Sequence, residues 1–162
     1  MIPTQDRIIC QYGVVVKDLR KTIDNYRNLG IGPWDFHSMN DKTMEYYYVD
    51  DKKVEEPWEF LIGLTDWNNI QLELMQPVSG PLIYWDFLEK QGEGIHHIKE
   101  YVPDEKIEDV ADSYRKQGVK VLAYGKFGKD KFFYLDTQKT LGAILELGNK
   151  LECPPPLEVI PL

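Results

Sequence analysis

The sequence is poor in the residues that most often carry chemistry. Its 162 residues include three histidines and two cysteines. The cysteines, Cys10 and Cys153, have neither the spacing of a zinc site nor that of a CxxC redox motif. Nothing therefore indicates a disulfide framework, and we expect a protein of the reducing cytoplasm.

Long apolar runs and basic clusters are missing as well. No stretch approaches the about 20 apolar residues of a membrane-spanning helix, and residues 1–7 lack the pattern of a secretory signal. Nineteen Lys and Arg against 27 Asp and Glu give a net charge of −8. No cluster of Lys and Arg residues is interleaved with aromatic residues, so the sequence predicts neither nucleic acid nor a membrane as a partner.

What the sequence does contain is an ordered series of strand and helix patterns. Residues 8–16 form an Ile- and Val-rich run typical of a buried strand. Apolar residues then recur at helical spacing between Asp18, which suits an N-cap, and Gly30, which suits the end of a helix. Three strand-like runs complete the first half, at residues 34–38 leading into 44–49, at 58–64 and at 70–76.

The pattern then restarts. Residues 82–88 fit a short amphipathic helix that ends before Gly92, and a strand follows at residues 95–102. A helix from Asp104 to Gly118 precedes strand-like runs at residues 119–124, 131–135 and 143–147. We expect one α+β domain made of two tandem βαβββ modules that form a curved mixed-sheet cup. Its parts are a first module (1–79), a linker helix (80–93), a second module (94–150) and an extended, Pro-rich C-terminal tail (151–162) that cannot form a central strand.

Aligning the two halves matches polar residues within apolar strands. Gln11 aligns with His97, and Glu73 aligns with Glu146, each glutamate standing between two leucines. If a pseudo-twofold axis relates the halves, these four side chains point into one cavity. Two buried carboxylates beside an imidazole need a cation, a proton or an arginine. A divalent metal ion would satisfy all four side chains at once.

The histidines are not equivalent in this interpretation. Neighbouring strand residues point to opposite faces, so we expect His97 in the cavity and His96 elsewhere, in a structural or supporting position. His37 has no partner that the sequence identifies, and we expect it at the surface or at the rim of a pocket.

Five motifs together resemble the glyoxalase or vicinal-oxygen-chelate superfamily. They are VVKDL at 15–19, YRNLG at 26–30, LELMQP at 72–77, GEGIHHI at 92–98 and GAILEL at 142–147. The resemblance implies a homodimer, a small-molecule substrate and one divalent metal ion (Zn, Co, Ni or Mn) held by Gln11, Glu73, His97 and Glu146. A Gln at the first ligand position resembles glyoxalase I of the eukaryotic type. It argues against the ring-cleaving dioxygenases, whose iron site needs two histidines and one carboxylate.

Among known families, the sequence motifs are most similar to those of methylmalonyl-CoA epimerase. This resemblance implies an acyl-CoA substrate, proton abstraction α to a carbonyl and a metal-stabilised enediolate. An epimerase works best with one carboxylate on each face of the substrate. Glu59 matches the family's second glutamate, so Glu146 and Glu59 are the predicted catalytic pair.

Two alternatives stay open. A glyoxalase I-like lactoylglutathione lyase, acting on a thiol adduct, would use the same four ligands and would not need Glu59. A non-catalytic small-molecule binding or resistance protein would use an aromatic pocket, for which Tyr46, Tyr48 and Trp58 are the candidates. The two buried carboxylates, of Glu73 and Glu146, favour an enzyme over a binder. The enzyme would be an epimerase, another isomerase or a lyase.

Overall fold

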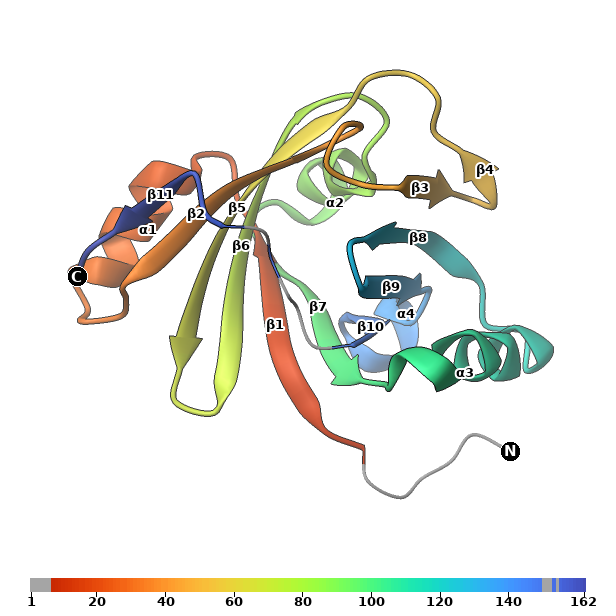
Figure 1. Cartoon of the computed structure of the whole chain (residues 1–162). Helices are drawn as coiled ribbons and strands as arrows, with labels where there is room; N and C mark the ends of the chain where they lie inside the picture. The colour runs from red at the N-terminus through yellow and green to blue at the C-terminus, as the bar shows by residue number, and fades with distance from the viewer. Residues whose placement is uncertain (1–6, 150–152, 154) are drawn as a thin grey trace.

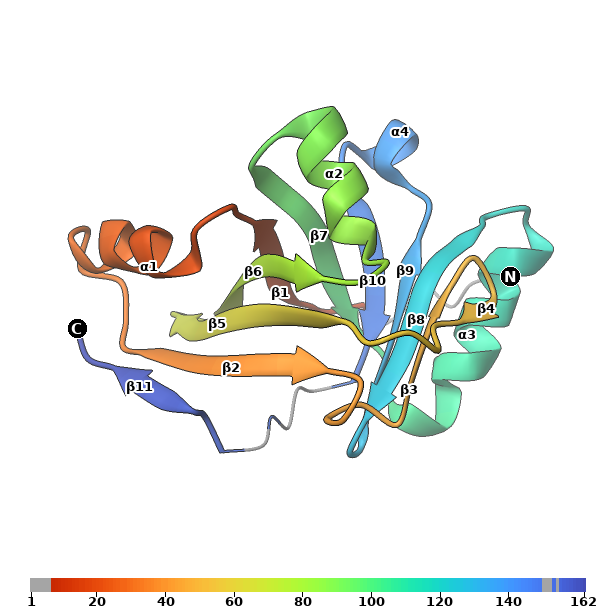
Figure 2. The ribbon, with the colours of Figure 1, turned by 90° about the horizontal axis from the view of Figure 1, so that it is seen from above.

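The computed structural model describes residues 7–149, 153 and 155–162 (Figure 1). All its strands join one curved sheet, in the order β11-β2-β5-β6-β1-β7-β10-β9-β8-β3-β4. Figure 2 shows this sheet bent into an open trough with helices on its outside and at its end. The predicted α+β fold class is confirmed.

The first half of the sheet comes from the first part of the chain. Its elements are β1 (Ile9–Val15), α1 (Leu19–Arg27), β2 (Trp34–Asn40), β5 (Glu59–Trp67) and β6 (Ile70–Ser79). The side chain of Asp18 accepts a hydrogen bond from the Lys21 backbone N–H and so begins α1. Leu19 and Ile23 are the buried residues of this helix, and they pack on the outer face of the sheet.

The second half repeats this order after a connecting helix. That helix is α2 (Ile83–Gln91), and the elements after it are β7 (Gly94–Tyr101), α3 (Asp104–Lys116), β8 (Val121–Phe127), β9 (Asp130–Leu135), α4 (Gln138–Leu141) and β10 (Ile144–Gly148). β1 and β7 pair antiparallel at the centre, while β1 pairs parallel with β6 and β7 pairs parallel with β10. Gly13 lies opposite Glu73 just as Lys99 lies opposite Glu146, so the halves are related in register.

One segment of the first half leaves its own sheet. We expected residues 44–49 to continue the strand at 34–38, but the chain turns at Asn40, whose side chain accepts the Lys42 and Thr43 backbone N–H groups. β3 (Tyr46–Val49) and β4 (Lys52–Lys53) then pair beyond β8, at the far edge of the second half. We call residues 44–58 the crossing arm.

The opposite edge of the sheet is also formed by a distant segment. β11 (Glu158–Ile160), in the tail, pairs antiparallel with β2, at an edge position where Pro-rich chain is tolerated. Residue 150, and residues 151, 152 and 154 of the tail, lie outside the described residues. Both outer edges of the sheet therefore depend on chain from the other half.

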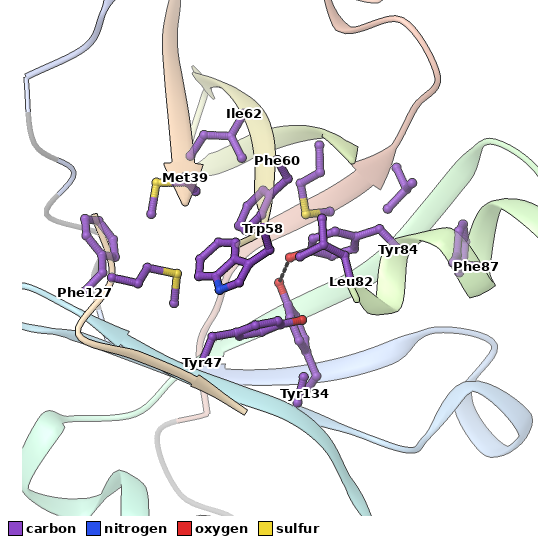
Figure 3. Packing of buried hydrophobic residues seen from close by; sticks show 14 of the residues in the cluster. Met39, Tyr47, Trp58, Phe60, Ile62, Leu82, Tyr84, Phe87, Phe127 and Tyr134 are labelled. Atoms are coloured by element: carbon purple, nitrogen blue, oxygen red, sulfur yellow. Dashed lines mark hydrogen bonds between the residues drawn. The ribbon is translucent and has the colours of Figure 1, made fainter. Parts of the chain in front are cut away.

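Three clusters of buried apolar residues hold the sheet and helices together. Two lie on the outer face, one under α1 and one under α3. The third fills the trough, where Met39, Tyr47, Trp58, Phe60 and Tyr84 meet Phe127 and Tyr134 from the other half (Figure 3). In the described part of the chain, no helix is long and apolar enough to cross a membrane.

Candidate metal centre

The four predicted ligands meet around one atom, the Nε2 of His97. Glu146 Oε2 lies 3.0 Å from it, Glu73 Oε2 lies 3.3 Å from it, and Gln11 Oε1 lies 3.3 Å from it. They come from β10, β6 and β1, which are packed side by side with β7 in the centre of the sheet. All four side chains are buried.

Strand alternation explains why both glutamates point inward. Leu72 and Leu74 belong to the cluster under α1, and Leu145 and Leu147 belong to the cluster under α3. The residue between each pair of leucines must face the trough. Gly13 leaves space for the His97 ring, because a Cβ atom at position 13 would overlap that ring.

The spacing of these atoms fits a shared metal ion. Ligand atoms about 2.1 Å from one ion are about 3.0 Å apart at a right angle and about 3.4 Å apart at the tetrahedral angle. The three observed separations, 3.0, 3.3 and 3.3 Å, fall in this interval. One nitrogen and three oxygens suit a divalent transition metal. No group of three or more His, Cys, Asp and Glu side chains is preassembled as a metal site within the described residues, so the ion stays a prediction.

Two charged residues that the sequence analysis missed lie beside this group. The Lys99 ammonium is 3.3 Å from Glu146 Oε1 and 3.8 Å from Asp130 Oδ2, and both side chains are almost fully buried. Alternation could have found them. Lys99 is two residues from His97 on the same strand, and Asp130 alternates with Phe132 and Tyr134, which face the trough.

The surroundings move the pKa values of these groups apart. Burial alone would lower the pKa of His97, but the Glu146 and Glu73 carboxylates outweigh it and raise that pKa to about 9. Burial raises the pKa of Asp130 to about 7, against the opposing effect of Lys99. Burial would also raise the pKa of Glu146, yet Lys99 and His97 hold it below its ordinary value.

The charges of the group balance with a divalent cation. Three carboxylates, of Glu73, Glu146 and Asp130, and one ammonium, of Lys99, sum to −2 when all are ionised. A divalent ion beside a neutral His97 brings the sum to zero. Without the ion, one proton on His97 and one proton on Asp130 also bring the sum of the charges to zero. The residues present therefore fit a divalent ion in donor type and charge.

His96 has the structural or supporting position that the sequence predicted but not the predicted face, and His37 does not lie where it was expected. Both rings of the His96–His97 pair face the trough, because the pairing with β1 steps from Gly13↔His97 to Val14↔Ile95 and leaves His96 as the extra residue of a bulge. A bulge cancels the alternation on which the expectation relied. The two Nδ1 atoms are 3.2 Å apart. His37, expected at the surface or a rim, is buried.

The structure does not bring Glu59 to this group. Its carboxylate accepts a hydrogen bond of 2.7 Å from Ser38 Oγ on the neighbouring strand β2. None of the contacts of His97, Lys99 or Glu146 described above involves it. The four predicted ligands are together, and the predicted catalytic partner of Glu146 is apart from them.

The chain matches a known family over most of its length. Residues 10–134 match the model of the Glyoxalase/Bleomycin resistance protein/Dioxygenase superfamily. The chain belongs to this superfamily. The suspected resemblance is thus confirmed, while no curated protein matches the chain significantly.

Solved structures share the fold of this superfamily member at low sequence identity. Methylmalonyl-CoA epimerase from Mycobacterium tuberculosis is 20% identical with a TM-score of 0.64, covering 93% of each chain. A variant of the Streptomyces coelicolor epimerase in complex with 2-nitronate-propionyl-CoA is 22% identical with a TM-score of 0.61, covering 88% of this chain and 96% of that one. A hypothetical protein from Bacillus halodurans C-125 is 18% identical with a TM-score of 0.63, covering 93% and 99%.

The trough of this superfamily member is nearly full. The cavity against Glu73, Lys99, Asp130 and Glu146 measures about 40 Å³, which suits solvent but not a substrate of several carbons. Trp58, a predicted substrate contact, is part of the filling and packs against Tyr47 and Phe60. The other two predicted contacts, Tyr46 and Tyr48, instead pack on Tyr124 of β8.

Proposed function

We propose that this protein is a metal-dependent enzyme that removes a proton α to a carbonyl group, and that it epimerises an acyl-CoA ester such as methylmalonyl-CoA. The observation that carries the proposal is the convergence of three oxygen ligands on His97 Nε2 beside a buried, ionised glutamate. The similar structures add support, since they include methylmalonyl-CoA epimerases, one of them in complex with 2-nitronate-propionyl-CoA.

Gln11, Glu73, His97 and Glu146 would hold the metal. The bound ion would supply a Lewis acid for the substrate carbonyl oxygen. The base in this proposal is Glu146, whose pKa is lowered, against the effect of burial, chiefly by the charge of Lys99. The Lys99 ammonium lies 3.3 Å from its Oε1.

Asp130 takes the place that the sequence analysis gave to Glu59. It lines the same inner cavity as Glu146, and burial raises its pKa to about 7, so it is partly protonated near neutral pH. Two carboxyl groups whose pKa values are pushed apart suit a base and an acid. We propose that Glu146 removes the proton and that Asp130 returns one, which requires the substrate to enter between the two carboxyl groups, where Lys99 Nζ now lies.

One observation favours the glyoxalase I-like alternative. A lyase that returns the proton to the neighbouring carbon needs a single glutamate, and Glu59 lies apart from the ligand group. A thiol adduct would then be the substrate. A non-catalytic binder is disfavoured, because two glutamates, an aspartate and a lysine are costly to bury in a simple apolar pocket.

The deciding experiment measures metal content and proton exchange on the same preparation. Stoichiometric metal with deuterium incorporation at the α-carbon of methylmalonyl-CoA in heavy water is the expected result. Metal without exchange, but with isomerisation of the methylglyoxal–glutathione adduct, would favour the lyase. A protein that binds no divalent metal after reconstitution would contradict both.

A further inference from the structure

A row of polar side chains crosses the inner face of the sheet at one level. Asp66 of β5 pairs with Gln71 of β6, and Gln71 pairs with Gln11 of β1. Lys99 of β7 and Glu146 of β10 continue the row on the next two strands. Asp66 and Gln71 are the two members of this row that the proposed reaction does not use.

Gln71 holds the side chain of Gln11 at its nitrogen end. Gln11 Nε2 donates a hydrogen bond of 2.6 Å to Gln71 Oε1. The other end of the same amide, Oε1, lies 3.3 Å from His97 Nε2, the atom around which the predicted metal ligands meet. Gln11 is buried, so both ends of its amide depend on protein partners. The hydrogen bond to Gln71 therefore decides which atom the amide offers to the metal.

Without this contact, the neighbouring carboxylates would favour the opposite direction of the Gln11 amide. An amide that is turned end for end keeps its shape but presents donors where it presented an acceptor. Glu73 Oε2 and Glu146 Oε2 lie 3.3 and 3.0 Å from the same His97 nitrogen, and ionised carboxylates only accept hydrogen bonds. They would attract the Nε2 end of Gln11, which is no ligand for a cation. An amide ligand in this place needs a partner that accepts a hydrogen bond on its far side.

The position of Gln71 suits it to be this acceptor. Gln71 is half-buried, and together with Asp66 it lines an open pocket of about 470 Å³ at the end of the trough. The pocket offers water and the paired strand offers the Asp66 carboxylate, so acceptors for the Gln71 nitrogen are available on that side. Its oxygen faces the buried Gln11 instead. A hydrogen bond donated by Gln11 to Gln71 therefore suits both amides.

We propose that Gln71 is a positioning residue that keeps the carbonyl oxygen of Gln11 directed at the metal. The inference rests on the metal site of the proposed function, and it adds the residue that makes a neutral amide a dependable ligand there. Gln71 acts through Gln11 and contacts neither the metal nor the substrate. Its replacement should weaken metal binding while Glu73, His97 and Glu146 keep their places.

The test is a titration of the metal-free protein with Co²⁺, followed by the visible absorption of the bound ion. Gln71→Met removes the acceptor at nearly constant size, and we expect about tenfold weaker binding, the lower end of the effect of residues that orient a metal ligand. Gln71→Glu can only accept a hydrogen bond, so it should bind at least as tightly as the wild type. Asn69, exposed in the turn before β6, lines the same pocket. Asn69→Met should leave the affinity unchanged, and Asn69→Glu corrects for the added charge.

Solvent exchange of the Gln11 side-chain amide, followed by NMR, gives a second measurement on the metal-free protein. We expect its hydrogens to exchange about fivefold faster in Gln71→Met, the effect of one net hydrogen bond. Unchanged exchange, equal Co²⁺ affinity of the wild type and Gln71→Met, or weakened binding by Gln71→Glu would each overturn this role and leave the proposed function standing. A wild-type protein that binds no divalent metal would overturn the proposed function itself, and the positioning role with it.

Discussion

Lys99 is the residue that couples the metal centre to the rest of the second half. It occupies the position that Gly13 has in the first half, opposite Glu146 as Gly13 is opposite Glu73. Glycine at 148 allows its long side chain to pass, because a Cβ there would overlap it. The ammonium is thereby held among carboxylates with almost no access to water, where its charge has its greatest effect.

We predict that Lys99→Met destabilises the protein, and more so at high pH. Removing one partner of a buried ion pair costs about 3 to 5 kcal/mol, because the carboxylates lose their compensating charge. The loss should be smaller at pH 5, where Asp130 is protonated. Urea unfolding at pH 5 and pH 8 measures both values. Lys90→Met, which breaks an exposed pair on α2, is the control and should leave the unfolding midpoint unchanged.

A second prediction concerns pH and the metal-free protein. The pKa of Asp130 rises on folding from 3.8 to about 7, and that of His97 rises from 6.5 to about 9. Each contribution is fully present below the unfolded pKa and is lost as pH rises through the folded one. The free energy of unfolding should therefore fall between about pH 4 and pH 9. The lowered pKa of Glu146 makes the free energy of unfolding rise with pH, but only in the acid range where this carboxyl group titrates.

Saturating divalent metal should reduce this decline, since the ion takes the place of the proton on His97. Thermal denaturation at pH 5, 7 and 9, with a chelator or with metal, measures the difference. A metal-free protein that becomes more stable towards pH 9 would contradict the charge assignment of the centre.

At the scale of the elements, the crossing arm fills the trough beside the centre. Trp58 and Tyr47 from this arm lie in the middle of the trough (Figure 3), and the inner cavity is too small for a substrate. We propose that the arm moves to admit the substrate into the trough. Its anchors on the second half are the β3–β8 pairing and the stack of Tyr48 on Tyr124 at 4.8 Å.

We predict that Tyr48→Ala loosens this arm without disturbing the centre. Loss of the stack removes about 1 kcal/mol, so amide hydrogens of residues 46–49 should exchange about fivefold faster. Amides of residues 144–148, in the central strand β10, serve as the internal control. Arm amides that exchange only on global unfolding would show that the arm is fixed and that substrate enters elsewhere.

Element geometry also explains what the sequence could and could not predict. Alternation placed Glu73 and Glu146 correctly because β6 and β10 run regularly there, and it placed His97 correctly because the pairing of β7 with β10 is regular from that residue onward. It failed at His96, where an extra residue bulges out, since a bulge has no composition signal. Alternation also could not predict that residues 46–49 pair with a strand about 75 positions later. Nor could it predict that the Glu59 carboxylate accepts a hydrogen bond from Ser38.

At the scale of the whole molecule, the outer face of the central strand pair is unusually apolar. Ile9 on β1 and Ile95 and Ile98 on β7 are all more than a third exposed. Such a patch is typical of protein contacts, and the superfamily resemblance led us to expect a homodimer. We propose that a second copy of the chain covers this face.

We predict that Ile98→Lys shifts the protein from dimer to monomer. A charge at the centre of an apolar contact is costly to bury, whereas the side chain points away from the metal centre and the fold should persist. Sedimentation velocity measures the change. Leu29→Lys, at an isolated exposed leucine after α1, is the control. A wild-type chain that sediments as a monomer would refute the proposed contact.

The pairing of β11 with β2 has a consequence for how the protein is made. Ile160 pairs with Trp34, which precedes it by 126 positions (160 minus 34). At roughly 5 to 20 residues per second, a ribosome needs about 6 to 25 s to reach it. Throughout that time the β2 edge, with Trp34 and Phe36, has no covering strand. The nascent first half is thus a ready target for edge-to-edge association, and this interval is when chaperones would be needed most.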